Sequence, residues 1–187
     1  MIIPEQNFIL KNGTTIILRS PLPEEAELVL HFFKLFFKES YRYMMLPASH
    51  WDEFPLEQEV KILSTFKDTP NQFMLTAYHE GKIVGFLSLF PMQGHFHKQN
   101  ARFALGTLQA FKGQGLGKKL IQIAESYAKS LDFHRIEFGV RTFNTNAIAL
   151  YEQLGFEKAG HLKEVAFIDG QYYDEFIYQK IIDRKNS

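Results

Sequence analysis

The sequence predicts an α+β (mixed α/β) fold. Turn-forming pairs such as Asn-Gly, Glu-Gly and Asp-Gly separate short runs of β-branched, aromatic and leucine residues, which is typical of β-hairpins. Other segments repeat apolar residues every three or four positions, which is typical of amphipathic helices. The 187 residues, 45% of them hydrophobic, are enough to bury one core, so we expect residues 1–187 to form a single domain.

The first part of the chain predicts a hairpin and two helices. Phe8–Leu10 and Thr15–Leu18 flank Asn12-Gly13, a pair that readily adopts positive φ, so we expect an opening β-hairpin or a tight turn into a first strand. A helix starts near Pro23, because acidic residues suit its positive end and apolar residues follow at helical spacing up to Phe37. A second helix covers Pro55–Phe66.

The middle of the chain predicts a second hairpin, a strand and a long helix. Phe73–Tyr78 and Lys82–Phe90 are separated by Glu80-Gly81, and a strand at Arg102–Leu108 follows. The apolar spacing then becomes helical, with lysines, a glutamine and a glutamate on the opposite face. The apolar positions are Leu116, Leu120, Ile123, Ala124, Tyr127, Ala128 and Leu131.

The last part predicts a strand, a helix and a final hairpin. Ile136–Val140 alternates as a strand, and Asn146–Leu154 has the pattern of a helix. Val165–Ile168 and Tyr172–Tyr178 bracket Asp169-Gly170 as the last hairpin.

Charge and composition disfavour several classes of function. The 21 basic and 21 acidic side chains cancel, which argues against nucleic acid or an anionic membrane as partner. The absence of cysteine excludes disulfides, thiolate nucleophiles and cysteine metal sites, and we expect no metal. The sequence has neither a signal-peptide pattern near Met1 nor an uninterrupted apolar span, so a cytoplasmic protein is expected.

A glycine loop stands between the Arg102–Leu108 strand and the following helix. It consists of Lys112, Gly113, Gln114, Gly115, Leu116, Gly117 and Lys118. Free N–H groups and the helix dipole attract phosphate at such a position, and glycines let the backbone approach it closely. Lys119 adds further positive charge. A simple glycine turn is the alternative interpretation.

Spacing excludes two common nucleotide motifs for this loop. A Walker loop needs glycine where Lys112 stands and a hydroxyl residue where Lys119 stands. The dinucleotide fingerprint would need glycine at Lys118 and an early βαβ unit. If the loop binds phosphate, it does so as neither a Walker loop nor a dinucleotide-binding loop.

A second motif runs from Asn144 to Phe156. Asn144 can cap a helix, Gly155 can adopt the left-handed conformation after it, and Phe156 can pack back on Leu150 or Tyr151. The functional interpretation adds an amide that hydrogen-bonds a ligand and a tyrosine that can return a proton to a leaving thiolate. For Tyr151 alone, a core tyrosine is the commoner outcome.

Together the two motifs resemble a known family. K-G-Q-G-L-G and N-x-x-A-x-x-L-Y-x-x-x-G-F, about thirty residues apart, are similar to the signature motifs of the GNAT superfamily of acyl-CoA-dependent N-acyltransferases. Thr15–Glu25, His79–Gly85 and the ending F-x-D-G-x-Y-x-D at Phe167–Asp174 extend the resemblance over nearly the whole chain. It implies a central mixed, mostly antiparallel, twisted sheet flanked by helices, with two strands splayed at the coenzyme A site.

The resemblance implies which residues bind acetyl-CoA, the acyl donor. The glycine loop, residues 112–118, would hold the pyrophosphate of coenzyme A. The pantetheine arm would pair with the preceding strand, at Leu105, Gly106, Thr107 and Leu108. The thioester would enter between Leu108 and the strand ending at Arg141, with Asn144 holding the arm and Tyr151 facing the sulfur.

The chain departs from the family where a general base is often found. Many members have a glutamate at the points that correspond to Gly139 or lie near Gln99, and neither residue here is a carboxylate. Glu137, two residues before Gly139, is the candidate base, although a salt bridge with Arg135 or Arg141 is an equal alternative. His95 and His97 are weaker candidates, for which a solvated loop is the better interpretation.

The resulting hypothesis is transfer of an acetyl group to a primary amine by direct attack. The acceptor is a small molecule, amino acid or peptide N-terminus, and aromatic residues in Phe32–Tyr43 and Phe167–Tyr173 favour an apolar amine unless they form the core. Backbone N–H groups near Leu108 would polarise the carbonyl. An acyl-CoA-binding sensor or interaction module is the alternative, and a homodimer is left open.

Overall fold

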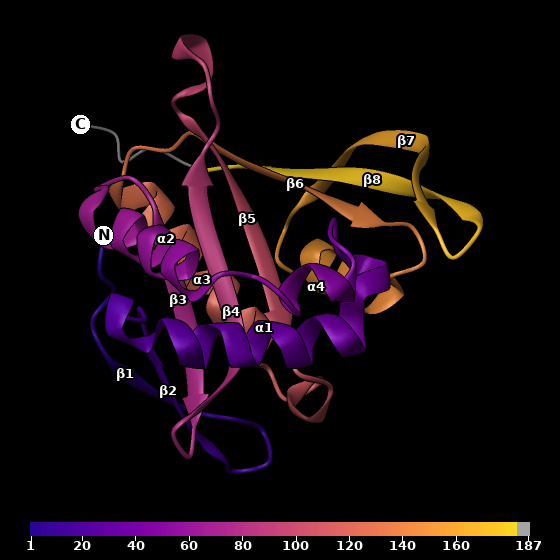
Figure 1. Cartoon of the computed structure of the whole chain (residues 1–187). Coiled ribbons are helices and arrows are strands. Elements are labelled where there is room, and N and C mark those ends of the chain that lie inside the picture. Colours follow the sequence, from indigo (N-terminus) through magenta and orange to yellow (C-terminus); the bar gives the residue numbers. More distant parts are fainter. Residues whose placement is uncertain (183–187) are drawn as a thin grey trace. The chain divides into compact units, whose positions relative to one another are not determined.

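The computed structural model of the chain describes residues 1–182 and contains α-helices and one eight-stranded sheet (Figure 1). The strands follow the order β1-β2-β3-β4-β5-β6-β8-β7. Every strand pair with a recorded register is antiparallel except β5–β6, which is parallel, so the mixed, mostly antiparallel sheet is confirmed. The strands are β1 (Gln6–Ile9), β2 (Thr15–Arg19), β3 (Phe73–His79), β4 (Lys82–Pro91), β5 (Asn100–Thr107), β6 (Arg135–Arg141), β7 (Glu157–Ile168) and β8 (Gln171–Ile181). The α-helices are α1 (Ala26–Ser40), α2 (Leu56–Asp68), α3 (Leu116–Ser130) and α4 (Thr145–Gln153).

Contacts along the chain cluster into two compact units. Unit 1 comprises residues 1–90 and 104–124, and unit 2 comprises residues 91–103 and 125–182. The expectation of a single domain stays a prediction.

Unit 1 is built around the aromatic face of α1. Glu25 precedes the helix, and its carboxylate accepts a hydrogen bond from the N–H of Leu22 at 2.8 Å, which helps to fix where the helical turns begin. Phe32 and Phe36 stack with centroids 5.7 Å apart, and both rings meet Phe86 of β4 edge-on. Helix α1 therefore packs against the sheet through phenylalanines spaced at helical intervals.

The aromatic residues of α1 that were considered for acceptor binding belong to this core. Phe33, Phe36 and Phe37 are at most 5% exposed, and Phe33 stacks on Trp51 at 4.5 Å. Core packing is thus confirmed for these three side chains, and they leave no apolar surface for an acceptor.

Unit 2 contains a second aromatic cluster around β6 and α4. Phe138 of β6 lies with its ring centroid 4.3 Å from Phe103 and from Tyr151, and 5.1 Å from Phe156. The ring of Tyr178 of β8 also stacks on Phe138, with centroids 6.4 Å apart. The packing of Phe156 against Tyr151, with centroids 6.1 Å apart, confirms one of the two contacts predicted for that residue.

The predicted hairpins and helices are present, with small shifts at most of their ends and one large shift at the start of β7. Strand β5 begins two residues before Arg102, and β7 begins at Glu157, well before Val165. Most side chains of β7 are exposed, and the register shifts twice along its pairing with β8, so apolar alternation could not reveal its first half. The recorded β5–β6 register covers Asn100–Arg102, and the splaying of these strands farther along stays a prediction.

Candidate functional site

The glycine loop, residues 112–118, lies in unit 1 and leads directly into α3. Gly113 and Gly115 adopt φ values of 73° and 90°, the left-handed region that favours glycine. A Cβ atom added at Gly113 would meet nothing within 4 Å, and one at Gly115 would meet only the Cε atom of Lys11 at 4.0 Å. A small side chain at either glycine would therefore meet no close contact from the rest of unit 1.

The start of α3 offers N–H groups beside this space. The N–H of Lys119 donates to the carbonyl of Gly115 at 3.0 Å, which is the first such bond of the helix. The N–H groups just before it have no carbonyl one turn earlier to donate to, as at every helix N-terminus. The carbonyl of Gln114 accepts a hydrogen bond from the N–H of Lys11 at 3.2 Å, which ties the loop to the β1–β2 turn.

Three lysines surround the loop. The ammonium group of Lys112 lies 5.9 Å from the ring centroid of Tyr43, and that of Lys119 lies 5.8 Å from that of Phe8. Lys118 is exposed. The three lysines thus lie, along the chain, within four residues of the first residue of α3, Leu116, at the end of a helix that favours anions.

The second half of β5 holds the residues expected beside the pantetheine arm. Gly106 packs against the core of unit 1, because a Cβ there would overlap the ring of Phe36 and lie 2.8 Å from that of Phe86. The N–H of Leu108 donates to the carbonyl of Val84 at 2.9 Å, and the N–H of Gln109 donates to the carboxylate of Glu39 at 2.8 Å. These two donors are occupied, so they do not supply the free N–H groups that were expected near Leu108.

Asn144 and Tyr151 lie in unit 2. The side-chain oxygen of Asn144 accepts from the N–H of Ala147 at 3.4 Å, so the predicted cap of α4 is present. Tyr151 is 8% exposed among aromatic rings, and burial raises the pKa of its hydroxyl well above its ordinary value. The phenol therefore keeps its proton at neutral pH, as a proton donor must.

Comparison with known proteins identifies the family to which the chain belongs. A model of the acetyltransferase (GNAT) family matches residues 30–156, a range that includes the glycine loop, Asn144 and Tyr151. The chain belongs to the GNAT acetyltransferase family. The resemblance seen in the sequence motifs is thereby confirmed.

Curated relatives are acetyltransferases by name, and solved structures share the fold. The chain is 28% identical over 131 residues to spermidine N(1)-acetyltransferase of Vibrio cholerae, covering 67% of this chain and 75% of that protein. Two further curated N-acetyltransferases match over about half of their own length. The fold matches a GNAT acetyltransferase from Streptococcus pneumoniae with a TM-score of 0.81 and 23% identity, over 89% of this chain and 99% of that one.

A further solved structure carries the acyl donor. The putative acetyltransferase yncA of Salmonella typhimurium, described with its cofactor acetyl-CoA, matches with a TM-score of 0.78 and 15% identity. The match covers 92% of this chain and 96% of that one.

The candidate base of this GNAT chain, Glu137, is held by two arginines. One of its oxygens accepts from Nη2 of Arg102 at 3.0 Å, and the other accepts from Arg135. The salt bridge with Arg135 that was weighed from the sequence is confirmed, whereas Arg141 pairs with Glu175 instead, at 2.6 Å. Sequence reasoning missed Glu175, because its pairing depends on the register of β6 with β8, where Arg141 stands directly opposite Glu175.

The two histidines that were weaker candidates lie in a surface turn. His95 and His97 are exposed, and the N–H of His97 donates to the carbonyl of Gly94 at 3.0 Å. Their solvated interpretation is confirmed.

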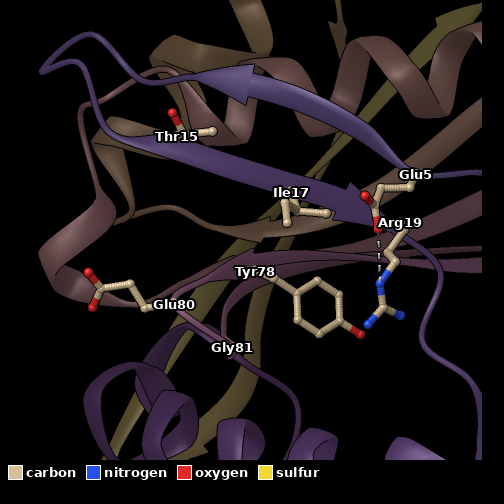
Figure 2. A pocket seen from close by; sticks show the side chains of 7 residues that line it. All are labelled: Glu5, Thr15, Ile17, Arg19, Tyr78, Glu80 and Gly81. Atoms are coloured by element: carbon tan, nitrogen blue, oxygen red, sulfur yellow. Dashed lines mark ion pairs between the residues drawn. The ribbon is translucent and has the colours of Figure 1, made fainter.

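A shallow hollow of about 260 Å³ in unit 1 is lined by none of the predicted site residues (Figure 2). Its lining includes Arg19, whose guanidinium lies 4.1 Å from the ring centroid of Tyr78 and 3.8 Å from the carboxylate of Glu5. Arg19 is also paired with Glu25 at 2.6 Å. The guanidinium in the hollow is thus already paired with carboxylates, and Glu80 adds a further carboxylate to the lining.

Residues 1–182 contain no group of three or more His, Cys, Asp or Glu side chains that could hold a metal ion. None of their helices has both the length and the apolar character needed to cross a membrane.

Proposed function

We propose that this GNAT chain transfers the acetyl group of acetyl-CoA to a primary amine by direct attack. The observation that carries the proposal is the glycine loop: two left-handed glycines with open space above them, followed by the N-terminus of α3 and flanked by lysines. This arrangement suits the pyrophosphate of coenzyme A, whose charge meets N–H dipoles and ammonium groups together.

The other predicted residues have roles that fit their surroundings. The backbone of Leu105–Leu108 accompanies the pantetheine arm, and the amide of Asn144 holds it, since capping occupies only the side-chain oxygen of Asn144. Tyr151 gives its proton to the departing thiolate. Positioning of the amine against the thioester supplies much of the rate enhancement.

The acceptor is proposed as a primary amine of a small molecule, an amino acid or a peptide N-terminus. A related protein acts on spermidine by its name, so a polyamine belongs among the acceptors to be tested. Because the α1 phenylalanines are buried, the apolar preference now depends on the more exposed Tyr43 and Tyr172.

The alternative function is that of an acyl-CoA-binding sensor or interaction module. It is favoured by the lack of a carboxylate at positions 99 and 139, and by the occupied N–H groups of Leu108 and Gln109. A sensor would need the glycine loop but would not need a proton donor at the sulfur.

One experiment separates the two functions. The protein is incubated with acetyl-CoA and a panel of amino acids, short peptides and polyamines, and release of free thiol is followed in parallel with acetyl-CoA binding by calorimetry. The enzyme hypothesis predicts amine-dependent thiol release with at least one class of acceptor. Tight binding of acetyl-CoA without turnover on any amine would support the sensor instead.

A further inference from the structure

A carboxylate from β8 occupies the place of the missing side chain at Gly139. A Cβ atom added to Gly139 would overlap Oε1 and Cδ of Glu175 and would lie 3.1 Å from its Cγ. The register explains this approach: Gly139 stands opposite Ile177 and Arg141 opposite Glu175, so Glu175 is the diagonal neighbour of Gly139. The absence of a side chain at Gly139 thus makes room for the carboxylate.

Arg141 holds this carboxylate by one oxygen. Its Nη1 donates to Oε2 of Glu175 at 2.6 Å, and the two side chains are only 8% and 19% exposed. Within residues 1–182, no hydrogen bond to Oε1 of Glu175 is recorded. On the other side, β7 places the apolar Leu162 opposite Glu175. The carboxylate is therefore held by Arg141 through Oε2, while Oε1 has no hydrogen-bond donor within the described residues.

Neighbouring carboxylates of unit 2 are more fully engaged. Both oxygens of Glu137 accept from arginines. Both oxygens of Asp174 are also engaged, one by His161 at 2.7 Å and one by the N–H of Glu164 at 2.8 Å. Glu175 thus differs from both in keeping one oxygen without a recorded donor.

The carboxylate of Glu175, from β8, packs against Gly139 of β6, and the residue before Gly139 contacts the candidate proton donor. Gly139 directly follows Phe138, the residue whose ring packs 4.3 Å from Tyr151. Successive residues of a strand face opposite sides of the sheet. Tyr151 and the carboxylate of Glu175 therefore lie on opposite faces of the same two-residue stretch of β6.

We propose that Glu175 is the general base of the acetyl transfer, with Arg141 as the residue that positions it. This inference depends on the proposed function. The acceptor amine arrives as an ammonium ion, and Oε1 of Glu175 takes one of its protons. The freed nitrogen lone pair then forms the new C–N bond as the C–S bond breaks.

The protons balance over the whole turnover. The thiolate takes the proton of the Tyr151 hydroxyl, and the second proton lost by the nitrogen restores that hydroxyl. The proton on Glu175 passes to solvent. The products are the N-acetylated amine, the free thiol of coenzyme A and one proton.

The test compares variants of the full chain in amine-dependent thiol release. Glu175→Gln keeps the size and the hydrogen bond to Arg141 but accepts no proton, so kcat/KM should fall by about 10²–10⁴-fold while acetyl-CoA affinity stays unchanged. The loss should shrink as pH rises toward the pKa of the acceptor amine, because a neutral amine needs no base. Glu157→Gln, the same change on the exposed start of β7, serves as the matched control and should retain wild-type rates.

A double variant tests whether catalysis depends on the position of the carboxylate rather than on the strand that carries it. Glu175→Ala alone should be as defective as Glu175→Gln. The double variant Glu175→Ala with Gly139→Glu places a carboxylate in the same volume, now attached to β6. Its kcat/KM should be at least about 10-fold higher than that of Glu175→Ala alone, which would recover part of the activity lost with the base. Circular dichroism and thermal melting establish that each variant is folded.

The outcomes separate this inference from the proposed function. Wild-type turnover with an undiminished Glu175→Gln rate overturns the role of Glu175 and leaves the acetyltransferase intact. A large loss in Glu137→Gln together with an unchanged Glu175→Gln assigns the base to Glu137. A wild-type protein that releases no thiol with any amine overturns the proposed function, and the role of Glu175 with it.

Discussion

At the scale of single residues, burial determines the chemistry that Tyr151 can perform. Its ring packs against the rings of Phe103, Phe138, Phe156 and Tyr178, and burial raises the pKa of its hydroxyl. The ring therefore contributes to packing, while the hydroxyl stays protonated at neutral pH, as the proposed donor to the thiolate must.

Tyr151→Phe separates these two contributions. The ring remains, so the melting temperature should change little, but turnover should fall by about 10²–10⁴-fold if the hydroxyl protonates the thiolate. Single-turnover thiol release at saturating acetyl-CoA measures this step without interference from slow product release. Equal rates in the variant and the wild type would leave Tyr151 as a core residue.

Tyr178→Phe is the matched control, because it removes a hydroxyl from the same cluster. The hydroxyl of Tyr178 donates to Glu152 at 2.7 Å, so its loss should cost about 1 kcal/mol of stability and leave turnover unchanged.

Glu59 is a second residue whose protonation is governed by burial. It is 1% exposed in α2, and its Oε1 has no hydrogen-bond partner within residues 1–182. Desolvation raises its pKa from 4.5 to about 7 in the folded protein. Folding therefore favours the protonated carboxyl.

This shift predicts a pH dependence of stability. The contribution of Glu59 is fully present below pH 4.5, decreases as the pH rises, and is lost once the pH passes about 7. The loss amounts to about 3 kcal/mol, from 1.36 kcal/mol for each pKa unit. Urea denaturation of Glu59→Gln between pH 5 and 9 should remove this part of the slope.

The exposed Glu57, also in the first turn of α2, provides the control. Glu57→Gln should follow the wild-type pH dependence. If Glu59→Gln did so too, the carboxyl of Glu59 would be ionised inside the folded protein, and its burial would not govern stability.

At the scale of elements, the junction of the glycine loop with α3 determines where coenzyme A can bind. The positive φ of Gly115 makes any other residue unfavourable there by about 1 kcal/mol, but the open space around it lets the fold accept a side chain. A substitution at Gly115 can therefore disturb the ligand more than the protein.

Gly115→Glu should weaken coenzyme A binding by roughly 100-fold or more, because its carboxylate would repel the pyrophosphate and displace it from the N–H groups. Calorimetry with coenzyme A measures the affinity. Gly170→Glu is the control: Gly170 has a φ of 80° and open space in the β7–β8 turn, so the backbone strain and the charge are the same. Equal affinities of the two variants would disprove the assignment of the loop.

At the scale of the whole molecule, local sequence patterns predicted the elements well. Asn12-Gly13, Glu80-Gly81 and Asp169-Gly170 lie in hairpin turns, with φ of 87°, 74° and 80° at their glycines. The cap at Asn144 and the glycine loop before α3 were also recognised from the sequence. Each of these features depends on residues a few positions apart, so the sequence carries it directly.

What depends on pairing between distant segments was decided only by the tertiary structure. The aromatic residues of α1 could have lined an acceptor site or formed the core, and their packing on Phe86 and Trp51 made them core. Glu137 was chosen as base because it lies two residues from Gly139, yet Arg102 and Arg135 occupy it, while the β6–β8 register brings Glu175 over Gly139. The sequence determined the family through its two motifs, and it determined most elements and the glycine loop because residues a few positions apart specify them. The surroundings of Glu137 and Glu175 depend on strand register and on ion pairs across the sheet. Both are set only when the strands pair, so only the tertiary structure could decide them.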